Sequence, residues 1–181
     1  LIRDLLSITS GEVIRMALLN SHYRKPINWT DDLIIVSRKK LDRLYGALRS
    51  IHSFSEVEPS SAVLDALRDD LNTPKALSEL FSITKSINST EDEADRQKMG
   101  SILQASASLL GLLSNDAEEW FKTSITETIS SEQIDQLISD RELARSQKDY
   151  KKADEIRETL LESGIIIEDG PKGVFWRYMD V

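Results

Sequence analysis

Apolar residues recur every three or four positions along most of this chain, as they do on the buried face of an α-helix. One stripe consists of Leu33, Val36, Leu41, Leu44, Leu48 and Ile51. Four of the predicted helices follow one another through short connections, which is typical of an antiparallel bundle. The expected helices cover residues 10–20, 30–50, 60–68, a segment that begins at Pro74, 91–113, 132–148 and 150–162.

The residue types at the ends of these stretches support the helix predictions. Ser10 and Thr30 each precede a helical run, and both residue types are preferred N-caps. The segment Asn72-Thr73-Pro74 also predicts a helix start, with Thr73 as the N-cap and Pro74 at the first helical position. Gly164 is expected to end the last helix.

The end of the chain follows a different pattern. Three consecutive isoleucines, 165–167, predict a strand, and residues 168–173 contain Gly and Pro and predict a hairpin turn that includes Asp169. A second strand is expected over 174–178. The predicted fold is therefore mainly α, with an antiparallel helical bundle followed by a small α+β domain of two helices and a hairpin-like sheet.

The charge of the chain restricts its partners. The formal net charge is −8, which argues against a general nucleic-acid coat. We expect neither DNA nor a membrane among the partners. Residues 1–50 nevertheless carry nine Lys/Arg against five Asp/Glu, so any RNA contact should be local. No apolar run reaches membrane-spanning length and no signal peptide is visible, so we expect a cytoplasmic protein.

The sequence offers no independent active site. It contains no Cys, and its two histidines, His22 and His52, lack the spacing of metal ligands, so we expect no catalytic and no metal-binding residues in this chain. The pair Asp69-Asp70 precedes a helix start, where acidic side chains favour the positive end of the helix dipole. The chain begins at Leu1, without an initiator Met and inside an apolar pattern, and we expect it to be part of a longer protein.

The last fifty residues hold the best candidates for binding. Single-stranded RNA is recognised by rings that stack on bases and by side chains that match base edges. Such side chains occur at helical spacing or near the hairpin here: Arg141, Arg145, Tyr150, Asp154, Arg157, Asp169, Trp176 and Arg177. The same Arg and Asp residues could form solvated ion pairs, and Trp176 could belong to the core. From spacing alone, a protein-binding helical module remains an alternative to RNA recognition.

Three segments resemble cysteinyl-tRNA synthetases. They are IRDLL with EVIRMALLNSHYRKPINW near the start, VLDALRDDLNTPKALSELF in the bundle, and RELARSQKDYKKADEIRETLLESGIIIEDGPKGVFWR at the end. The resemblance runs in register from Leu1 to Arg177. It implies the end of a stem-contact region over 1–29, a DALR-like helical bundle over 30–115, a linker over 116–130 and an anticodon-recognition domain over 131–181.

The resemblance also implies an activity. Members of this family are class I ligases that activate cysteine with ATP and transfer it to tRNA(Cys), with magnesium and a zinc-holding catalytic domain. Those cofactors and the catalytic motifs would lie upstream of Leu1, so this chain would need its own N-terminal catalytic domain as a partner. An acidic helical adaptor that binds only protein is the alternative.

Matching the family's tail residue by residue implies anticodon contacts at Arg145, Asp154 and Asp169, and a stacking ring at Tyr150, where family members often carry Trp. The family's anticodon, GCA, fits these side chains, because Arg can donate to guanine and Asp can accept from base amines. Weak, salt-sensitive contacts to the tRNA backbone are expected from basic residues. These are Arg24, Lys25, Lys148, Lys151 and Lys152, with Arg38, Lys39 and Lys40 as further candidates.

Overall fold

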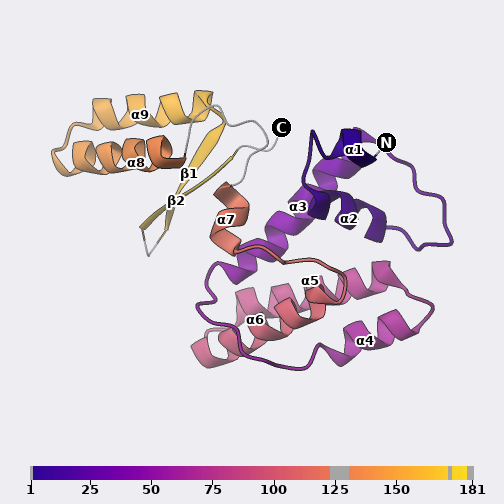
Figure 1. Cartoon of the computed structure of the whole chain (residues 1–181). Helices are drawn as coiled ribbons and strands as arrows, with labels where there is room; N and C mark the ends of the chain where they lie inside the picture. Colours follow the sequence, from indigo (N-terminus) through magenta and orange to yellow (C-terminus); the bar gives the residue numbers. More distant parts are fainter. Residues whose placement is uncertain (1, 123–130, 171–172, 179–181) are drawn as a thin grey trace. The chain divides into compact units, whose positions relative to one another are not determined.

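The computed structural model describes residues 2–122, 131–170 and 173–178 (Figure 1). The chain divides into two compact units, Leu1–Glu118 and Glu119–Val181, and each is described by itself. No helix among the described residues is long and apolar enough to cross a membrane.

The first unit consists of helices and their connections, as the apolar pattern predicts. Helix α3 packs against α2 and α5, and α5 packs between α4 and α6, so these helices share one core (Figure 1). The helices are α1 (Ile2–Leu5), α2 (Gly11–Leu19), α3 (Asp31–Leu48), α4 (Ser61–Arg68), α5 (Thr73–Ser89) and α6 (Glu93–Ser108). The short helix α7 (Ala117–Lys122) follows within the predicted linker, whose residues 123–130 lie outside the described part of the chain.

The helix starts confirm two of the predicted caps and correct the third. The side chains of Ser10 and Thr30 accept hydrogen bonds from the N–H groups of residues three positions later, at 3.3 and 3.2 Å. The prediction for Thr73 was wrong, because Asn72 caps α5 by accepting from the Lys75 N–H at 3.2 Å. Thr73 is already helical, so Pro74 occupies the second helical position. A missing N–H costs no hydrogen bond there, as at the first position, because the first N–H groups of a helix have no acceptor within the helix.

Four of the six residues of the apolar stripe predicted for 30–51 are buried, and Leu33 is half-buried. Val36, expected in the buried stripe of α3, is 47% exposed, because the buried face of that helix runs through Ser37 and Leu41 and Val36 lies to one side of it. Helix α6 ends at Ser108, earlier than the predicted 113, because Gly111 adopts a φ of +66° and redirects the chain. Gly100 is required for close packing, since a Cβ there would lie 2.6 Å from Ile51 Cγ1.

A buried carboxylate connects α2 to the segment that follows α6. Glu12 is 9% exposed, and it accepts hydrogen bonds from Tyr45 Oη at 2.8 Å, from the Leu113 N–H at 2.6 Å and from Asn115 Nδ2 at 3.0 Å. Burial raises the pKa of the Tyr45 hydroxyl, so this group stays protonated as a donor. The network joins residues about one hundred positions apart, and nothing in the sequence pattern indicates it.

The second unit is a helix pair with a two-stranded antiparallel sheet, as predicted (Figure 1). Helices α8 (Ser131–Ser146) and α9 (Tyr150–Glu162) pack side by side, and strand β1 (Ile165–Gly170) pairs with β2 (Gly173–Tyr178). Gly164 ends α9 with a φ of +76°, as expected. The core of this unit consists of Ile134, Ile138, Leu160, Ile165 and Trp176.

The strands are longer than the sequence predicted. Residues 168–170, expected in the turn, continue β1, and Asp169 pairs with Val174 across the sheet. The backbone pairing between β1 and β2 therefore continues through the polar residues of β1 and ends at the pair Gly170 and Gly173. Residues 171–172, the centre of the predicted turn, lie outside the described residues.

Candidate nucleic-acid interface

A tight turn joins α8 to α9 and sets the position of the side chains around it. The Lys148 and Asp149 N–H groups donate to the carbonyls of Arg145 and Ala144, at 3.0 and 2.9 Å. Lys148 lies in the left-handed region, with a φ of 61°, and the Asp149 carboxylate caps α9 by accepting from the Lys152 N–H at 3.2 Å. The end of α8 and the start of α9 are thus held together by backbone and capping hydrogen bonds.

Two candidate residues lie on one exposed face at the start of α9. Tyr150 is 62% exposed, and Asp154, one turn later, is also exposed, while Ala153 and Leu160 face the core. Neither Tyr150 nor Asp154 uses its side chain in a hydrogen bond, ion pair or ring contact within the described part of the chain. A ring face and a carboxylate are therefore both available to a ligand here.

The two arginines of α8 have different environments. Arg141 and Arg145 are four positions apart and were expected to share one face. Arg141 is 6% exposed, because it lies on the stripe that also buries Ile138 and Ala144. Arg145, in the last turn of α8, is exposed next to the turn that leads to Tyr150. The structure therefore brings Arg145, Tyr150 and Asp154 to the same end of the helix pair and leaves Arg141 in the core.

The candidates in the sheet differ from those on the helices. Asp169 lies in β1 beside Gly170, and its side chain lies outside the described residues, as does that of Arg177. Trp176 is 3% exposed, and its Nε1 donates to Asp135 Oδ1 at 2.9 Å. The Lys122 ammonium lies 5.7 Å from the centre of the same ring. Trp176 is therefore a core residue, the second of the two alternatives that the sequence left open.

Comparisons with known proteins match a segment of each unit. The family model of the DALR domain matches residues 62–114, and that of the cysteinyl-tRNA ligase anticodon binding domain matches residues 130–177. The cysteine–tRNA ligase of Parvibaculum lavamentivorans is 43% identical over 98% of this chain and 39% of its own length. Those of Maricaulis maris and Ehrlichia canis are 42% and 40% identical, over 99% and 95% of this chain and 40% and 38% of their own lengths.

The chain belongs to the cysteine–tRNA ligase family. It spans about two fifths of the length of the curated relatives that it matches. The anticodon-binding match includes α8, α9 and both strands almost to the end of β2, so it covers every candidate residue at the α8–α9 turn.

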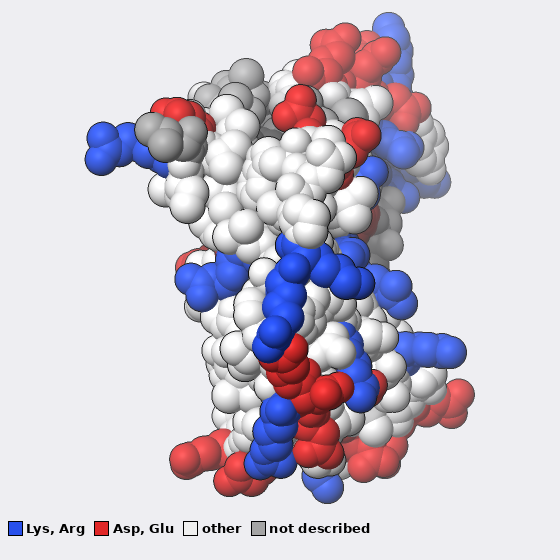
Figure 2. All heavy atoms as spheres, turned by 90° about the vertical axis from the view of Figure 1, so that its right-hand side faces the viewer, with Lys and Arg blue, Asp and Glu red and all other residues white. Residues whose placement is uncertain are grey.

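The basic residues of this family member are not equally available for phosphate. Lys148, Lys151 and Lys152 are exposed around the α8–α9 turn, and Lys151 lies 3.8 Å from Glu155. Lys40 is less suitable, because it donates to Asn20 Oδ1 and because burial lowers the pKa of its ammonium. In the lower half of Figure 2, the Lys/Arg and Asp/Glu side chains of the described residues lie interleaved.

Arg24 takes part in a side-chain clamp that the sequence did not indicate. Its Nε lies 2.9 Å from Asp70 Oδ2, and Tyr23 Oη donates to Asp70 Oδ1 at 2.7 Å. The Tyr23 ring also stacks on His22, with ring centres 4.8 Å apart. Asp70 and Leu71 both have left-handed φ angles, 53° and 51°, which are costly for residues with a Cβ. The clamp therefore holds a strained connection before α5 and offsets the charge of Arg24.

The clamp predicts an acid-dependent loss of stability. Hydrogen bonds from Tyr23 and Arg24 hold the pKa of Asp70 below its usual value. A carboxylate with a lowered pKa stabilises the fold above about pH 4, and this contribution is lost as the pH falls further. We expect urea denaturation to show Asp70→Asn as less stable than the parent at pH 6, with a difference that shrinks below pH 4. Tyr23→Phe should make the stability of the protein depend less on pH in this range. If Asp70→Asn is less stable than the parent by the same amount at pH 6 and below pH 4, the account is contradicted.

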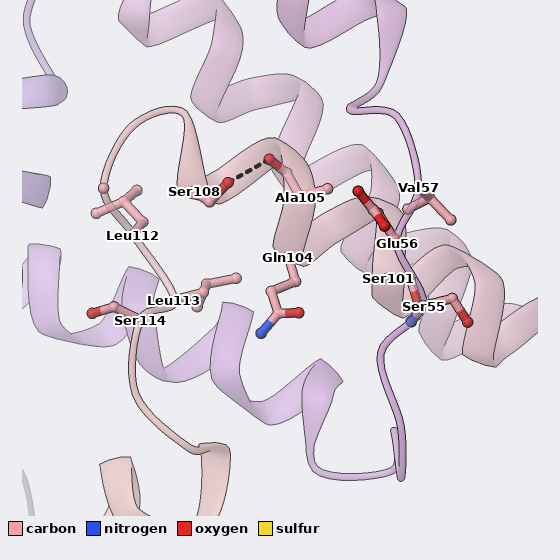
Figure 3. Close-up of a pocket in the computed structure, with 11 residues that line it drawn as sticks. Ser55, Glu56, Val57, Ser101, Gln104, Ala105, Ser108, Leu112, Leu113 and Ser114 are labelled. Atoms are coloured by element: carbon pink, nitrogen blue, oxygen red, sulfur yellow. Dashed lines mark hydrogen bonds between the residues drawn. The ribbon is translucent and has the colours of Figure 1, made fainter.

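A cavity of about 440 Å³ opens between the connection at 55–57, α6 and the segment 111–114 (Figure 3). Its lining is mostly hydroxyl and apolar, with Gln104 and Glu56. Ser101 accepts from the Ser55 N–H at 3.0 Å, which joins the 55–57 connection to α6, and Ser108 donates to the Ala105 carbonyl at 2.7 Å within α6 itself. Among the described residues, no group of three or more His, Cys, Asp or Glu could hold a metal ion, in this cavity or elsewhere.

Proposed function

We propose that this chain is the tRNA-binding part of a cytoplasmic cysteine–tRNA ligase, which joins cysteine to tRNA(Cys) with ATP, and that the α8–α9 end recognises the anticodon. One observation carries the proposal. Arg145, Tyr150 and Asp154 come together, exposed, at one end of a helix pair within the segment that matches the anticodon-binding family model.

Each side chain supplies a different part of base recognition. Stacking of a base on an aromatic ring contributes about 1–3 kcal/mol, and Tyr150 offers an exposed ring face for it. Asp154 accepts from base N–H groups, and Arg145 presents a planar fork of donors. Asp169 is the fourth proposed reader, from the neighbouring strand β1.

Contacts to the RNA backbone complete the proposed interface. Lys148, Lys151 and Lys152 surround the same turn and would bind phosphates close to the recognised bases. Lys25 is proposed for the other unit, together with Arg24, whose charge is partly offset by Asp70. Because few positive charges are involved in an acidic chain, affinity should be modest and should fall as salt rises.

We assign the chemical step to a catalytic domain elsewhere in the longer enzyme. Zinc-binding sites in such enzymes need thiolate or imidazole ligands, and this chain contains no Cys and two widely separated His. The residues present do not fit a zinc site, so zinc would be bound by the other domain, and we assign ATP and magnesium to that domain as well. This chain would supply selection of the tRNA.

Loss of the Asp154 carboxylate should reduce discrimination between tRNAs. In the full-length enzyme, Asp154→Ala is expected to lower kcat/KM for cognate tRNA(Cys) by about 5- to 150-fold, which corresponds to the roughly 1–3 kcal/mol of a good base contact. An anticodon-substituted tRNA, which lacks that contact already, should be charged as slowly as before. The measurement is aminoacylation of both tRNAs by parent and variant.

Glu158→Ala provides the matched control, because Glu158 is an exposed acidic residue on the same helix one turn beyond Asp154. It should leave both rates close to those of the parent. An equal fall for both tRNAs with Asp154→Ala would show that Asp154 does not read a base.

A further inference from the structure

An exposed stripe continues along α9 beyond the residues that the family resemblance implicates. Tyr150, Asp154, Arg157 and Leu161 follow at spacings of four, three and four residues, so they share one face of the helix. All four are exposed, with Tyr150 at 62% and Leu161 at 49%. At 1.5 Å per residue the stripe is about 16 Å long, which is enough for several nucleotides.

Asp154 and Arg157 do not neutralise each other, although residues three apart on a helix can form an ion pair. Arg157, like Asp154, makes no hydrogen bond or ion pair with any residue that the structure describes. On another face of the same helix, Lys151 and Glu155 do pair, at 3.8 Å. The stripe therefore presents a carboxylate and a guanidinium side by side, both open to a ligand.

We propose that Arg157 is a further base-reading residue, which together with Asp154 recognises a guanine that stacks near Tyr150. The proposal rests on the proposed function and deepens it. Neither the family resemblance nor the family models assign a role to Arg157. In the GCA anticodon the guanine is the first base.

The chemistry of the bases favours guanine over the other three. Guanine presents two adjacent donors, N1–H and the N2 amine, next to the acceptor O6. The two oxygens of one carboxylate match the two donors, and a guanidinium beside that carboxylate matches O6. Adenine, cytosine and uracil do not offer two adjacent donors on this edge. Guanine also has a large ring system for stacking on Tyr150.

Chemically altered tRNAs can separate the two contacts. Inosine lacks the N2 amine that Asp154 would bind, and 6-thioguanine keeps both donors but replaces O6 with sulfur, a weak acceptor. The full-length enzyme would be assayed for kcat/KM with tRNA(Cys) that carries guanine, inosine or 6-thioguanine at the first anticodon position. The parent enzyme should lose activity with both altered tRNAs.

Arg157→Ala should lower kcat/KM with the guanine tRNA by roughly 5- to 150-fold. It should then show no further loss with 6-thioguanine, because the O6 contact is already gone, while inosine should still reduce activity as it does in the parent. Arg157→Lys should recover part of the loss. Arg68→Ala, which removes an exposed arginine from α4, is the control and should discriminate as the parent does.

Two other results would overturn the proposal. If Arg157→Ala lowers kcat/KM by one factor for all three tRNAs, and Arg157→Lys restores it fully, Arg157 binds phosphate and does not read a base. If Arg157→Ala leaves kcat/KM unchanged for all three tRNAs, Arg157 is a solvated surface residue. If the parent enzyme itself does not distinguish guanine from other bases at this position, the first anticodon base is not recognised. That result would contradict the proposed function, whatever the role of Arg157.

Discussion

Trp176→Ala is expected to destabilise the second unit by about 3–5 kcal/mol, the largest effect of any single substitution considered for this chain. Trp176 is 3% exposed and lies in a core of five buried residues. It also anchors α8 to the sheet through the hydrogen bond from its Nε1 to Asp135. A unit as small as Glu119–Val181 has little stability to lose, so it should be largely unfolded in the variant.

Hydrogen exchange followed by mass spectrometry would measure this effect for each unit. Protection should fall in α8, α9 and both strands and should persist in α3 and α5. Trp176→Phe is the matched control, because it keeps a buried ring and removes the hydrogen bond to Asp135, for a cost of about 1–2 kcal/mol. Full protection of α8 and α9 in Trp176→Ala would show that this core does not depend on Trp176.

Glu12→Ala is expected to destabilise the first unit by about 3 kcal/mol. The Glu12 carboxylate accepts three hydrogen bonds, from Tyr45, Leu113 and Asn115, and its removal leaves these donors without their partner in a buried site. The substitution also releases the segment after α6 from α2. Denaturation in urea, followed by circular dichroism, would measure the change.

Two further variants test the explanation. Tyr45→Phe removes one hydroxyl from the same network and should cost less, about 1–2 kcal/mol. Glu58→Ala removes an exposed carboxylate from a connection and should change stability by less than about 0.5 kcal/mol. Equal effects of Glu12→Ala and Glu58→Ala would contradict the assignment of a buried network.

Local residue chemistry predicted the fold class and most helix starts. Ser10 and Thr30 were recognisable as caps because a cap depends on residues within one turn of it. The early end of α6 was missed, because the apolar pattern continues past Ser108 while the chain turns at Gly111. The extension of β1 through Asp169 was missed for a similar reason, since pairing across a sheet depends on the partner strand.

The candidate site could be predicted only in part. Helical spacing placed Tyr150, Asp154 and Arg157 on one face, and the structure leaves all three exposed there. The same spacing grouped Arg141 with Arg145, although Arg141 is buried in the core. Spacing specifies which residues share a face, but burial depends on which neighbouring element covers that face.

By itself, the sequence of this protein determined the order of its helices, the switch to a hairpin at the end and the residues that could read RNA, because each depends on short-range pattern. Only the tertiary structure decided that Trp176 is a core residue, that Asp70 is bound to Tyr23 and Arg24, and that Glu12 is buried. These features join residues 41 to 103 positions apart. Such contacts arise from packing of whole elements, and no local spacing of residue types encodes them.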